Sequence, residues 1–376
     1  MVERSQARGR RLALGALFGL ALAAFAFGAA LGDSPKPEPE AEVKVASTLS
    51  APRLAGERIV TGFRGTSVSA ALARAVGEGR VAGVVLFAAN FPSRAAGRRL
   101  IARLQAIRRP PSLRDPLLIM VDQEGGLVKR VDGAPTVSAE EMGRRGPAFS
   151  REQGRRTATN LRELGFNVDL APVLDVARPG GTIAAAERGF GTTAARVAAT
   201  AIPFAAGLQS GGVAATGKHF PGLGAAPANT DFAVQRLGLS KQTLRQVDEA
   251  PYGAFVAAGG DMVMLSTAIY PALSPLPAAF SRRIASGELR RRLGFEGVSI
   301  TDALETVAVR AFGSPAEAGV AAAGAGVDLL LFTDLAAAER ARRALVARLR
   351  AGSLDRAEFE ASAQRVLDLR HELAPR

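Results

Sequence analysis

The chain has 376 residues, 48% of them hydrophobic, which is enough for one large folded domain and argues against a disordered chain. It contains no cysteine and only two histidines, so disulfide bonds, thiolate metal sites and lipid attachment at a cysteine are excluded, and a zinc enzyme is disfavoured. The net charge of +13 comes from arginines scattered along the sequence with only 5% aromatic residues, which favours an anionic cell envelope over nucleic acid as the partner.

The N-terminus is typical of an export signal. An arginine-rich start is followed by an uninterrupted, weakly polar run at residues 12–31 that ends in small residues. A run of about twenty apolar residues also just spans a bilayer, so a cleaved signal peptide and an uncleaved membrane anchor both remain open for residues 1–32. We expect an exported protein, either extracellular or in the cell envelope, with residues 12–31 as its anchor if the signal is retained.

Residues 33–46 are predicted to form an extended linker. Pro35, Pro37 and Pro39 stand among charged residues there, which is the composition of a spacer rather than of a packed element. The folded domain is therefore expected to occupy residues 47–376.

Short apolar runs bounded by turn signals or charge predict strands, and each is followed by a stretch compatible with a helix. Many of these runs are apolar at successive positions, as expected for parallel strands that are buried on both faces. Helix starts are predicted at Ser314, which precedes a proline and a capping glutamate, and at Asp355. The eight expected strands lie at residues 58–62, 83–87, 117–122, 167–172, 213–218, 262–266, 297–302 and 328–332.

Eight alternations of strand and helix predict a single-domain (β/α)8 barrel of the TIM type. A doubly wound open α/β sheet is the alternative. The Gly-Phe-Arg-Gly stretch at residues 62–65, after the first strand, lacks the glycine spacing of a dinucleotide-binding fold.

In such a barrel, polar residues at the C-terminal ends of the strands converge on one site. Asp122 ends the third strand, Asp175 follows the fourth, Lys218 and His219 end the fifth, and Asp302 ends the seventh. Each has a structural alternative, because a strand-end aspartate often caps a helix or a turn, and a Lys-His pair can be a satisfied structural contact. Together they predict a polar cavity, because charged groups at the ends of buried strands need partners.

These residues belong to motifs that resemble glycoside hydrolase family 3, and most closely its single-domain bacterial β-N-acetylhexosaminidases. The resemblance runs from residue 59 to the C-terminus. Its most specific part is Lys-His-Phe-Pro-Gly at residues 218–222. The other matches, in the family's order, are Val-Asp-Gln-Glu-Gly-Gly at 121–126, Ala-Pro-Val-Leu-Asp-Val at 171–176, Arg-Gly-Phe-Gly at 188–191, and Thr-Asp-Ala-Leu at 301–304.

The resemblance implies a retaining glycosidase in which Asp302 is the nucleophile that forms a covalent glycosyl-enzyme. It also implies that the hydroxyls of the cleaved sugar are bound by Asp122, Arg130, Arg188, Lys218 and His219. For the two arginines, a salt bridge to one of the aspartates is the alternative. The mechanism needs no metal and no cofactor, the partner is a carbohydrate, and a monomer is the default expectation.

The chain departs from the family's pattern after the fifth strand. The histidine that acts as general acid/base in the hexosaminidase branch is replaced by Asp231, its supporting aspartate by Asn229, and a second histidine of the motif by Leu223. In one explanation Asp231 is the proton donor, and the neutral Asn229 avoids repulsion between two carboxylates. In the other, the acid/base is lost and the protein is an impaired hydrolase or an envelope-associated glycan-binding protein.

The sequence favours N-acetylglucosamine, released from cell-wall glycan fragments, as the sugar. This expectation combines the family resemblance with the export signal and the basic charge. Leu127 stands where the family's pattern has an arginine, so a β-glucosidase specificity remains the alternative.

Overall fold

The computed structural model describes residues 44–374, so the predicted signal segment and residues 33–43 of the predicted linker lie outside the described part. The described part begins close to the expected domain start, with helix α1 (Val45–Thr48), whose Ala46 is buried. Within residues 44–374, no helix is both long enough and apolar enough to cross a membrane.

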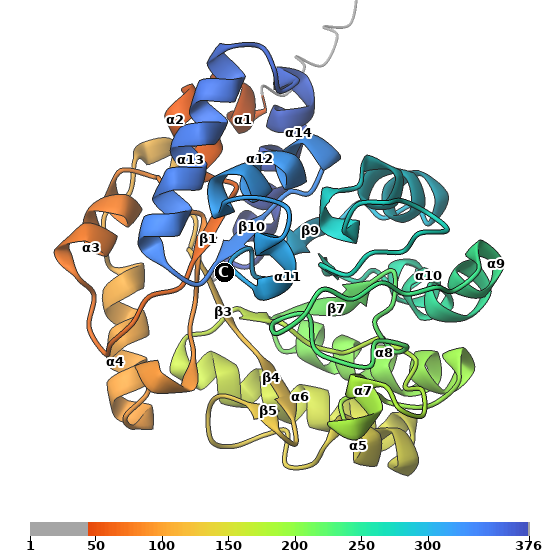
Figure 1. The fold of residues 1–376 in the computed structure, drawn as a ribbon. Coiled ribbons are helices and arrows are strands. Elements are labelled where there is room, and N and C mark those ends of the chain that lie inside the picture. Colours follow the sequence, from red (N-terminus) through yellow and green to blue (C-terminus); the bar gives the residue numbers. More distant parts are fainter. Residues whose placement is uncertain (1–43, 375–376) are drawn as a thin grey trace, which may run out of the picture. The chain divides into compact units, whose positions relative to one another are not determined.

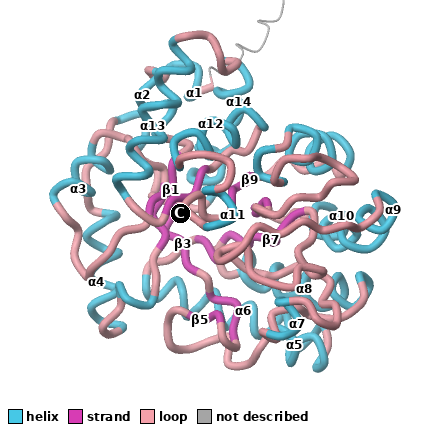
Figure 2. The backbone as a smooth tube through the Cα atoms, in the orientation of Figure 1, coloured by secondary structure: helices cyan, strands magenta, loops and turns pink. Residues whose placement is uncertain are grey.

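Parallel strands form the central sheet, which closes on itself (Figures 1 and 2). The strand order is β10-β1-β2-β3-β6-β7-β8-β9, and a parallel bridge between Ile300 and Leu329 joins the two ends of this order. Closure confirms the predicted (β/α)8 barrel and makes the open-sheet alternative wrong. The strands are β1 (Ile59–Thr61), β2 (Gly83–Val85), β3 (Leu118–Val121), β6 (Val168–Asp169), β7 (Ala214–Phe220), β8 (Met262–Leu265), β9 (Val298–Thr301) and β10 (Leu330–Phe332), one in each predicted run.

Both faces of the strands are buried, as the successive apolar residues predicted. In β3, Leu118 and Met120 belong to an apolar cluster that also contains Val60, Met262 and Ile300 from the other strands, which is the barrel interior. Ile119, between them, belongs to the larger cluster that the helices share. The alternation follows from the two-residue period of a strand.

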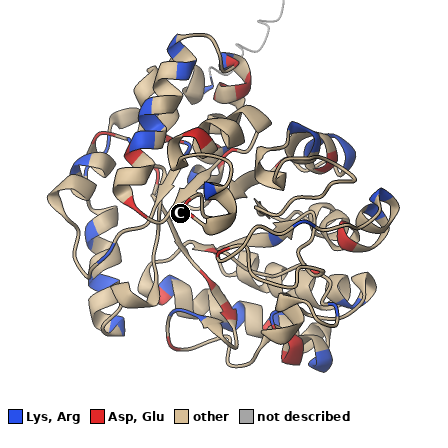
Figure 3. Ribbon diagram, viewed as in Figure 1, with Lys and Arg blue, Asp and Glu red and all other residues tan. Residues whose placement is uncertain are grey.

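Helices surround the barrel, and Figure 3 shows Lys and Arg on many of them rather than on one stripe. The two predicted helix starts are confirmed: Ser314 and Glu317 form a capping box, and the Asp355 side chain accepts a hydrogen bond from the Glu358 N–H. The α-helices after α1 are α2 (Ala51–Gly56), α3 (Ala70–Gly77), α4 (Arg94–Gln105), α5 (Ala139–Arg145), α6 (Pro147–Leu164), α7 (Thr182–Ala185), α8 (Ala194–Ser210), α9 (Lys241–Thr243), α10 (Ala250–Ala257), α11 (Val307–Arg310), α12 (Pro315–Ala325), α13 (Leu335–Arg350) and α14 (Arg356–Glu372).

Short 3-10 and π-helical turns complete the described part. The 3-10 turns are η1 (Ala88–Asn90), η2 (Pro111–Leu113) and η4 (Ala278–Phe280). The π-helical segments are η3 (Leu244–Asp248) and η5 (Arg283–Arg292).

A small antiparallel hairpin directly after β3 was not predicted. It consists of β4 (Gln123–Gly125) and β5 (Val128–Lys129). Gly125 and Gly126 turn the chain with φ angles of 95° and 55°, and a side chain at Gly125 would collide with the Val137 carbonyl. The Gln123 side chain accepts the N–H of Arg130 and donates to two carbonyls of the following loop. The hairpin therefore fixes Asp122 and Arg130 at the same strand end.

Candidate active site

A cavity of about 430 Å³ lies at the C-terminal ends of the barrel strands. Apolar side chains, among them Val85, Leu170, Met264 and Leu331, contribute to its lining. All the site residues predicted from the sequence also line it: Asp122, Arg130, Arg188, Lys218, His219, Asp231 and Asp302. The barrel therefore gathers at one place side chains that are up to 180 positions apart along the chain.

Asp302 stands directly after β9 and is half-buried. Its backbone N–H donates to the Leu265 carbonyl of β8, and its carboxylate accepts the Ala303 N–H at 2.7 Å. Burial raises the pKa of Asp302, the nearby His219 opposes this, and the negative charge of Asp231 adds to it. The cap of α11 is Thr306, so the carboxylate of Asp302 does not cap a helix and is available to a ligand.

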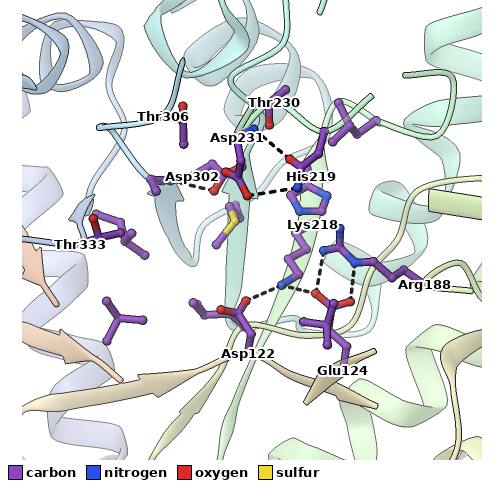
Figure 4. Close-up of a pocket in the computed structure, with 18 of the residues that line it drawn as sticks. Asp122, Glu124, Arg188, Lys218, His219, Thr230, Asp231, Asp302, Thr306 and Thr333 are labelled. Carbon is purple, nitrogen blue, oxygen red and sulfur yellow. Dashed lines mark hydrogen bonds and ion pairs between the residues drawn. The ribbon is translucent and has the colours of Figure 1, made fainter. Parts of the chain in front are cut away.

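Four charged side chains form a connected ion network, which lies below the neighbouring Asp231 and Asp302 in Figure 4. The Lys218 Nζ lies 2.7 Å from Asp122 Oδ1 and 2.6 Å from Glu124 Oε1. Arg188 donates to both Glu124 oxygens at 2.8 Å. Lys218 and Glu124 are 2% and 3% exposed, so water does little to weaken these contacts.

The charges of this network hold one another in their ionised forms. Burial alone would raise the pKa of Glu124, but Arg188 and Lys218 outweigh it and hold the pKa well below the usual range. Burial would likewise lower the pKa of Lys218, and Asp122 and Glu124 raise it instead. A preorganised set of donors and acceptors of this kind suits a polyhydroxylated ligand.

The two arginines predicted to bind sugar differ in their contacts. For Arg188, the salt-bridge alternative is what the structure contains, although the partner is Glu124 rather than an aspartate. Arg130 makes no side-chain hydrogen bond or ion pair with any residue of the described part, and its Nε is buried without a partner. Arg130 is therefore the guanidinium of this end of the cavity that is free for a ligand.

His219 is held by Asp175, a strand-end aspartate that was expected near the cavity but was given no catalytic or sugar-binding role. The Asp175 carboxylate lies 2.8 Å from His219 Nδ1 and also accepts the backbone N–H groups of His219 and Leu223, at 3.1 and 2.6 Å. Asp175 is fully buried, so it orients the imidazole from behind rather than contacting a ligand. Its position after the fourth strand was the available signal.

Asp231 lies on the loop that follows β7, and its side chain is exposed. The Asn229 amide donates to the Asp231 carboxylate at 3.1 Å, and the Asp231 N–H donates back to the Asn229 oxygen at 2.9 Å. The main chain of α11 holds this loop, because Val307 N–H donates to the Asp231 carbonyl at 3.2 Å. Figure 4 shows Asp231 beside Asp302 and His219.

The two leucines that replace polar residues of the family's pattern lie in different environments. Leu223 is 3% exposed and lines the cavity, so it takes the place of a histidine with an apolar wall. Leu127 is 77% exposed at the turn between β4 and β5 and lies outside the lining.

Glu124 and Glu305 are cavity residues that the sequence analysis missed. Glu305, three residues after Asp302, accepts the N–H groups of Thr333 and Asp334 at 2.9 and 3.2 Å. Burial raises the pKa of Glu305 to about 7. It ties the loop after β9 to the loop after β10. In residues 44–374, no three side chains of metal-binding type are close enough together to hold a metal ion.

Comparisons with known proteins agree with this site. The family model described as the glycosyl hydrolase family 3 N terminal domain matches residues 45–369. A secreted glycosyl hydrolase of Arthroderma benhamiae is 37% identical over 330 residues, which cover 85% of this chain and 93% of that protein. A beta-hexosaminidase of Xylella fastidiosa is 37% identical over 284 residues, which cover 73% of this chain and 82% of that protein.

Two solved structures are similar over most of the chain. One is a family 3 beta-N-acetylglucosaminidase from Paenibacillus sp. FPU-7, with a TM-score of 0.82 and 32% identity; the match covers 86% of this chain and 63% of that longer one. The other is a beta-N-acetylhexosaminidase from Beutenbergia cavernae, with a TM-score of 0.80, 31% identity, and coverage of 86% and 99%.

Proposed function

Because the chain belongs to glycoside hydrolase family 3, we propose that it is a retaining glycosidase that releases terminal β-linked N-acetylglucosamine, with Asp302 as nucleophile and Asp231 as general acid/base. The observation that carries this proposal is that Asp302 and Asp231 lie side by side in the same cavity as an ion network suited to sugar hydroxyls. Relatives whose names state a beta-hexosaminidase activity support the choice of sugar.

In the first step, the Asp302 carboxylate attacks the anomeric carbon while protonated Asp231 gives its proton to the glycosidic oxygen. The C–O bond to the leaving group breaks, and the sugar becomes esterified to Asp302. In the second step, the Asp231 carboxylate takes a proton from water, the water oxygen attacks the anomeric carbon, and Asp302 is released. Two inversions give net retention of the β configuration.

The remaining residues of the cavity position the sugar for these steps. Asp122 accepts hydroxyl hydrogens, while Arg130, Lys218 and the ring of His219 face the same cavity as donors or acceptors. Lys218 cannot turn away from the cavity without breaking its ion pairs with Asp122 and Glu124. This rigidity reduces the entropy that must be lost when the sugar is oriented.

The geometry around Asp231 supports retained catalysis over a lost acid/base. Asp231 and Asp302 line the same cavity and lie side by side in Figure 4, which is the arrangement that a pair of catalytic carboxyls in a retaining enzyme requires. Asn229 supplies a neutral amide to the Asp231 carboxylate, where an aspartate would add repulsion. An impaired, glycan-binding protein is the second candidate, and the exposure of Asp231 is the observation that favours it.

We further propose that the enzyme acts outside the cytoplasm on cell-wall glycan fragments. The apolar run at residues 12–31 and the net charge of +13 support export and contact with anionic surfaces. The similarity to a secreted glycosyl hydrolase supports the same location.

Hydrolysis of 4-nitrophenyl β-N-acetylglucosaminide and β-glucoside by the wild type and by Asp302→Ala tests the proposal. The wild type should be faster than Asp302→Ala by several orders of magnitude, prefer the N-acetylated sugar, and give the β anomer first in a proton NMR time course. A wild type no faster than Asp302→Ala on either glycoside, together with measurable binding of N-acetylglucosamine by calorimetry, would instead support the glycan-binding candidate.

A further inference from the structure

Two segments meet at the end of the cavity opposite the ion network. The Val307 and Ala308 N–H groups at the start of α11 donate to the Asp231 and Thr230 carbonyls, at 3.2 and 3.3 Å. Figure 4 shows Thr230 and Thr306 above the neighbouring Asp231 and Asp302, with Asp122, Glu124 and Lys218 below them. The cavity therefore has two ends, one made by buried ion pairs and one made by α11 and the Asp231 loop.

The α11 end contains a cation whose charge has no partner. Arg310, the last residue of α11, lines the cavity and is exposed. Within residues 44–374, the Arg310 side chain makes no ion pair and no hydrogen bond. Lys218 and Arg188, at the opposite end of the cavity, are both ion-paired. A guanidinium without a partner in a ligand cavity is suited to a carboxylate or another oxyanion, which it can bind through two parallel hydrogen bonds.

The reaction chemistry says which part of the substrate reaches Arg310. A proton donor must contact the glycosidic oxygen, so the leaving group begins beside Asp231 and extends away from the sugar-binding network. The backbone bonds between α11 and the Asp231 loop place Thr306 and Arg310 on that side. The carboxylate of Asp302, and that of Glu305 in its ionised form, would repel a negatively charged leaving group unless a cation offset them.

We propose that Arg310 is a specificity-determining residue that binds an anionic group, a carboxylate in the first instance, on the leaving group of the substrate. This inference rests on the proposed function, because it takes Asp231 as the proton donor. Arg310 does not take part in bond breaking. It raises kcat/KM for leaving groups that carry a negative charge within its reach.

The test compares two substrates that differ by one carboxylate: 4-nitrophenyl and 3-carboxy-4-nitrophenyl β-N-acetylglucosaminide. For each substrate, kcat/KM of Arg310→Gln is divided by that of the wild type, so that the intrinsic reactivity of the phenol cancels. The ratio should be about fivefold lower for the carboxylated substrate, the effect of one partly exposed charge pair. Arg310→Glu should lower it further, and raising the salt concentration should shrink the difference.

Arg350→Gln is the matched control, because Arg350 is exposed at the far end of α13 and its loss changes the net charge equally. It should affect the two substrates alike. Equal ratios for the two substrates in Arg310→Gln, with the wild type active on both, would overturn the role of Arg310 and leave the proposed function intact. β-N-Acetylglucosaminyl fluoride distinguishes failure of the Arg310 proposal from failure of the proposed function, because its leaving group is a single ion that cannot reach α11. A wild type that hydrolyses neither aryl glycoside nor the fluoride would overturn both proposals.

Discussion

Glu124→Gln removes the charge that connects the two halves of the ion network. The carboxylate accepts contacts from Arg188 at 2.8 and 2.8 Å and from Lys218 at 2.6 Å. The amide keeps one acceptor oxygen and places an NH2 group opposite a buried cation. Hydrogen bonds to charged groups contribute about 1.5–3 kcal/mol each, and breaking a buried pair costs about 3–5 kcal/mol. Since Asp122 still neutralises Lys218, we expect a loss of about 3 kcal/mol in the free energy of unfolding.

The corresponding change in melting temperature is small but measurable. An unfolding entropy of about 2.1 cal/mol/K per residue gives about 0.7 kcal/mol/K for a domain of this size, so Tm should fall by about 4 °C. The direction in which this stabilisation changes with pH follows from the lowered pKa of Glu124. Its stabilisation is fully present above the unfolded pKa of about 4.3 and is lost as the pH falls towards the folded value. The difference between wild type and variant should therefore be constant from pH 6 to 8 and narrow in acid.

Calorimetry or thermal denaturation followed by circular dichroism measures this difference, and Glu358→Gln is the matched control. Glu358 also pairs with both terminal nitrogens of an arginine, Arg282, but the two side chains are 54% and 52% exposed. Its loss should cost about 1 kcal/mol or less. If Glu124→Gln melts no lower than Glu358→Gln at pH 7, the network does not stabilise the site as argued.

Two further predictions concern residues to which the sequence analysis assigned no catalytic or sugar-binding role. Asp175→Asn removes the charge behind His219 and should lower kcat/KM by about 10²-fold with Tm nearly preserved; activity at the wild-type level would show that the imidazole needs no such support. Burial raises the pKa of Glu305 to about 7, so folding of the wild type should become less favourable as the pH rises from about 4.5 through 7, by about 1–3 kcal/mol. Glu305→Gln should lack this dependence in urea unfolding at pH 5 and pH 8, and identical pH profiles for the two proteins would contradict the shift.

The barrel could be predicted from the sequence because its strands are apolar on both faces. Runs such as Leu118 to Val121 cannot be exposed on either side, so their number and spacing determine the architecture. The convergence of Asp122, Lys218 and Asp302 followed from the same geometry, since parallel strands end at one face of the barrel.

The hairpin after β3 and the partners within the site could not be predicted in the same way. β4 and β5 are 3 and 2 residues long, too short for a periodic pattern. Glu124 lies on this hairpin, and its contact with Arg188 joins residues 64 positions apart, which depends on side-chain directions. Asp175 was expected among the strand-end residues of the cavity, with a helix cap or a turn as its alternative, but nothing in its local sequence indicates that its carboxylate contacts His219.

Chemical rescue of Asp231→Ala by azide tests the central claim most directly. With an activated aryl β-N-acetylglucosaminide, which needs no proton donor in the first step, the glycosyl-enzyme on Asp302 should accumulate because no base activates water. Azide, a nucleophile that needs no base, should then restore turnover and give the β-glycosyl azide as the product. Turnover of Asp231→Ala at the wild-type rate without azide, or an unchanged slow rate with no glycosyl azide formed, would contradict the assignment of Asp231 as the acid/base.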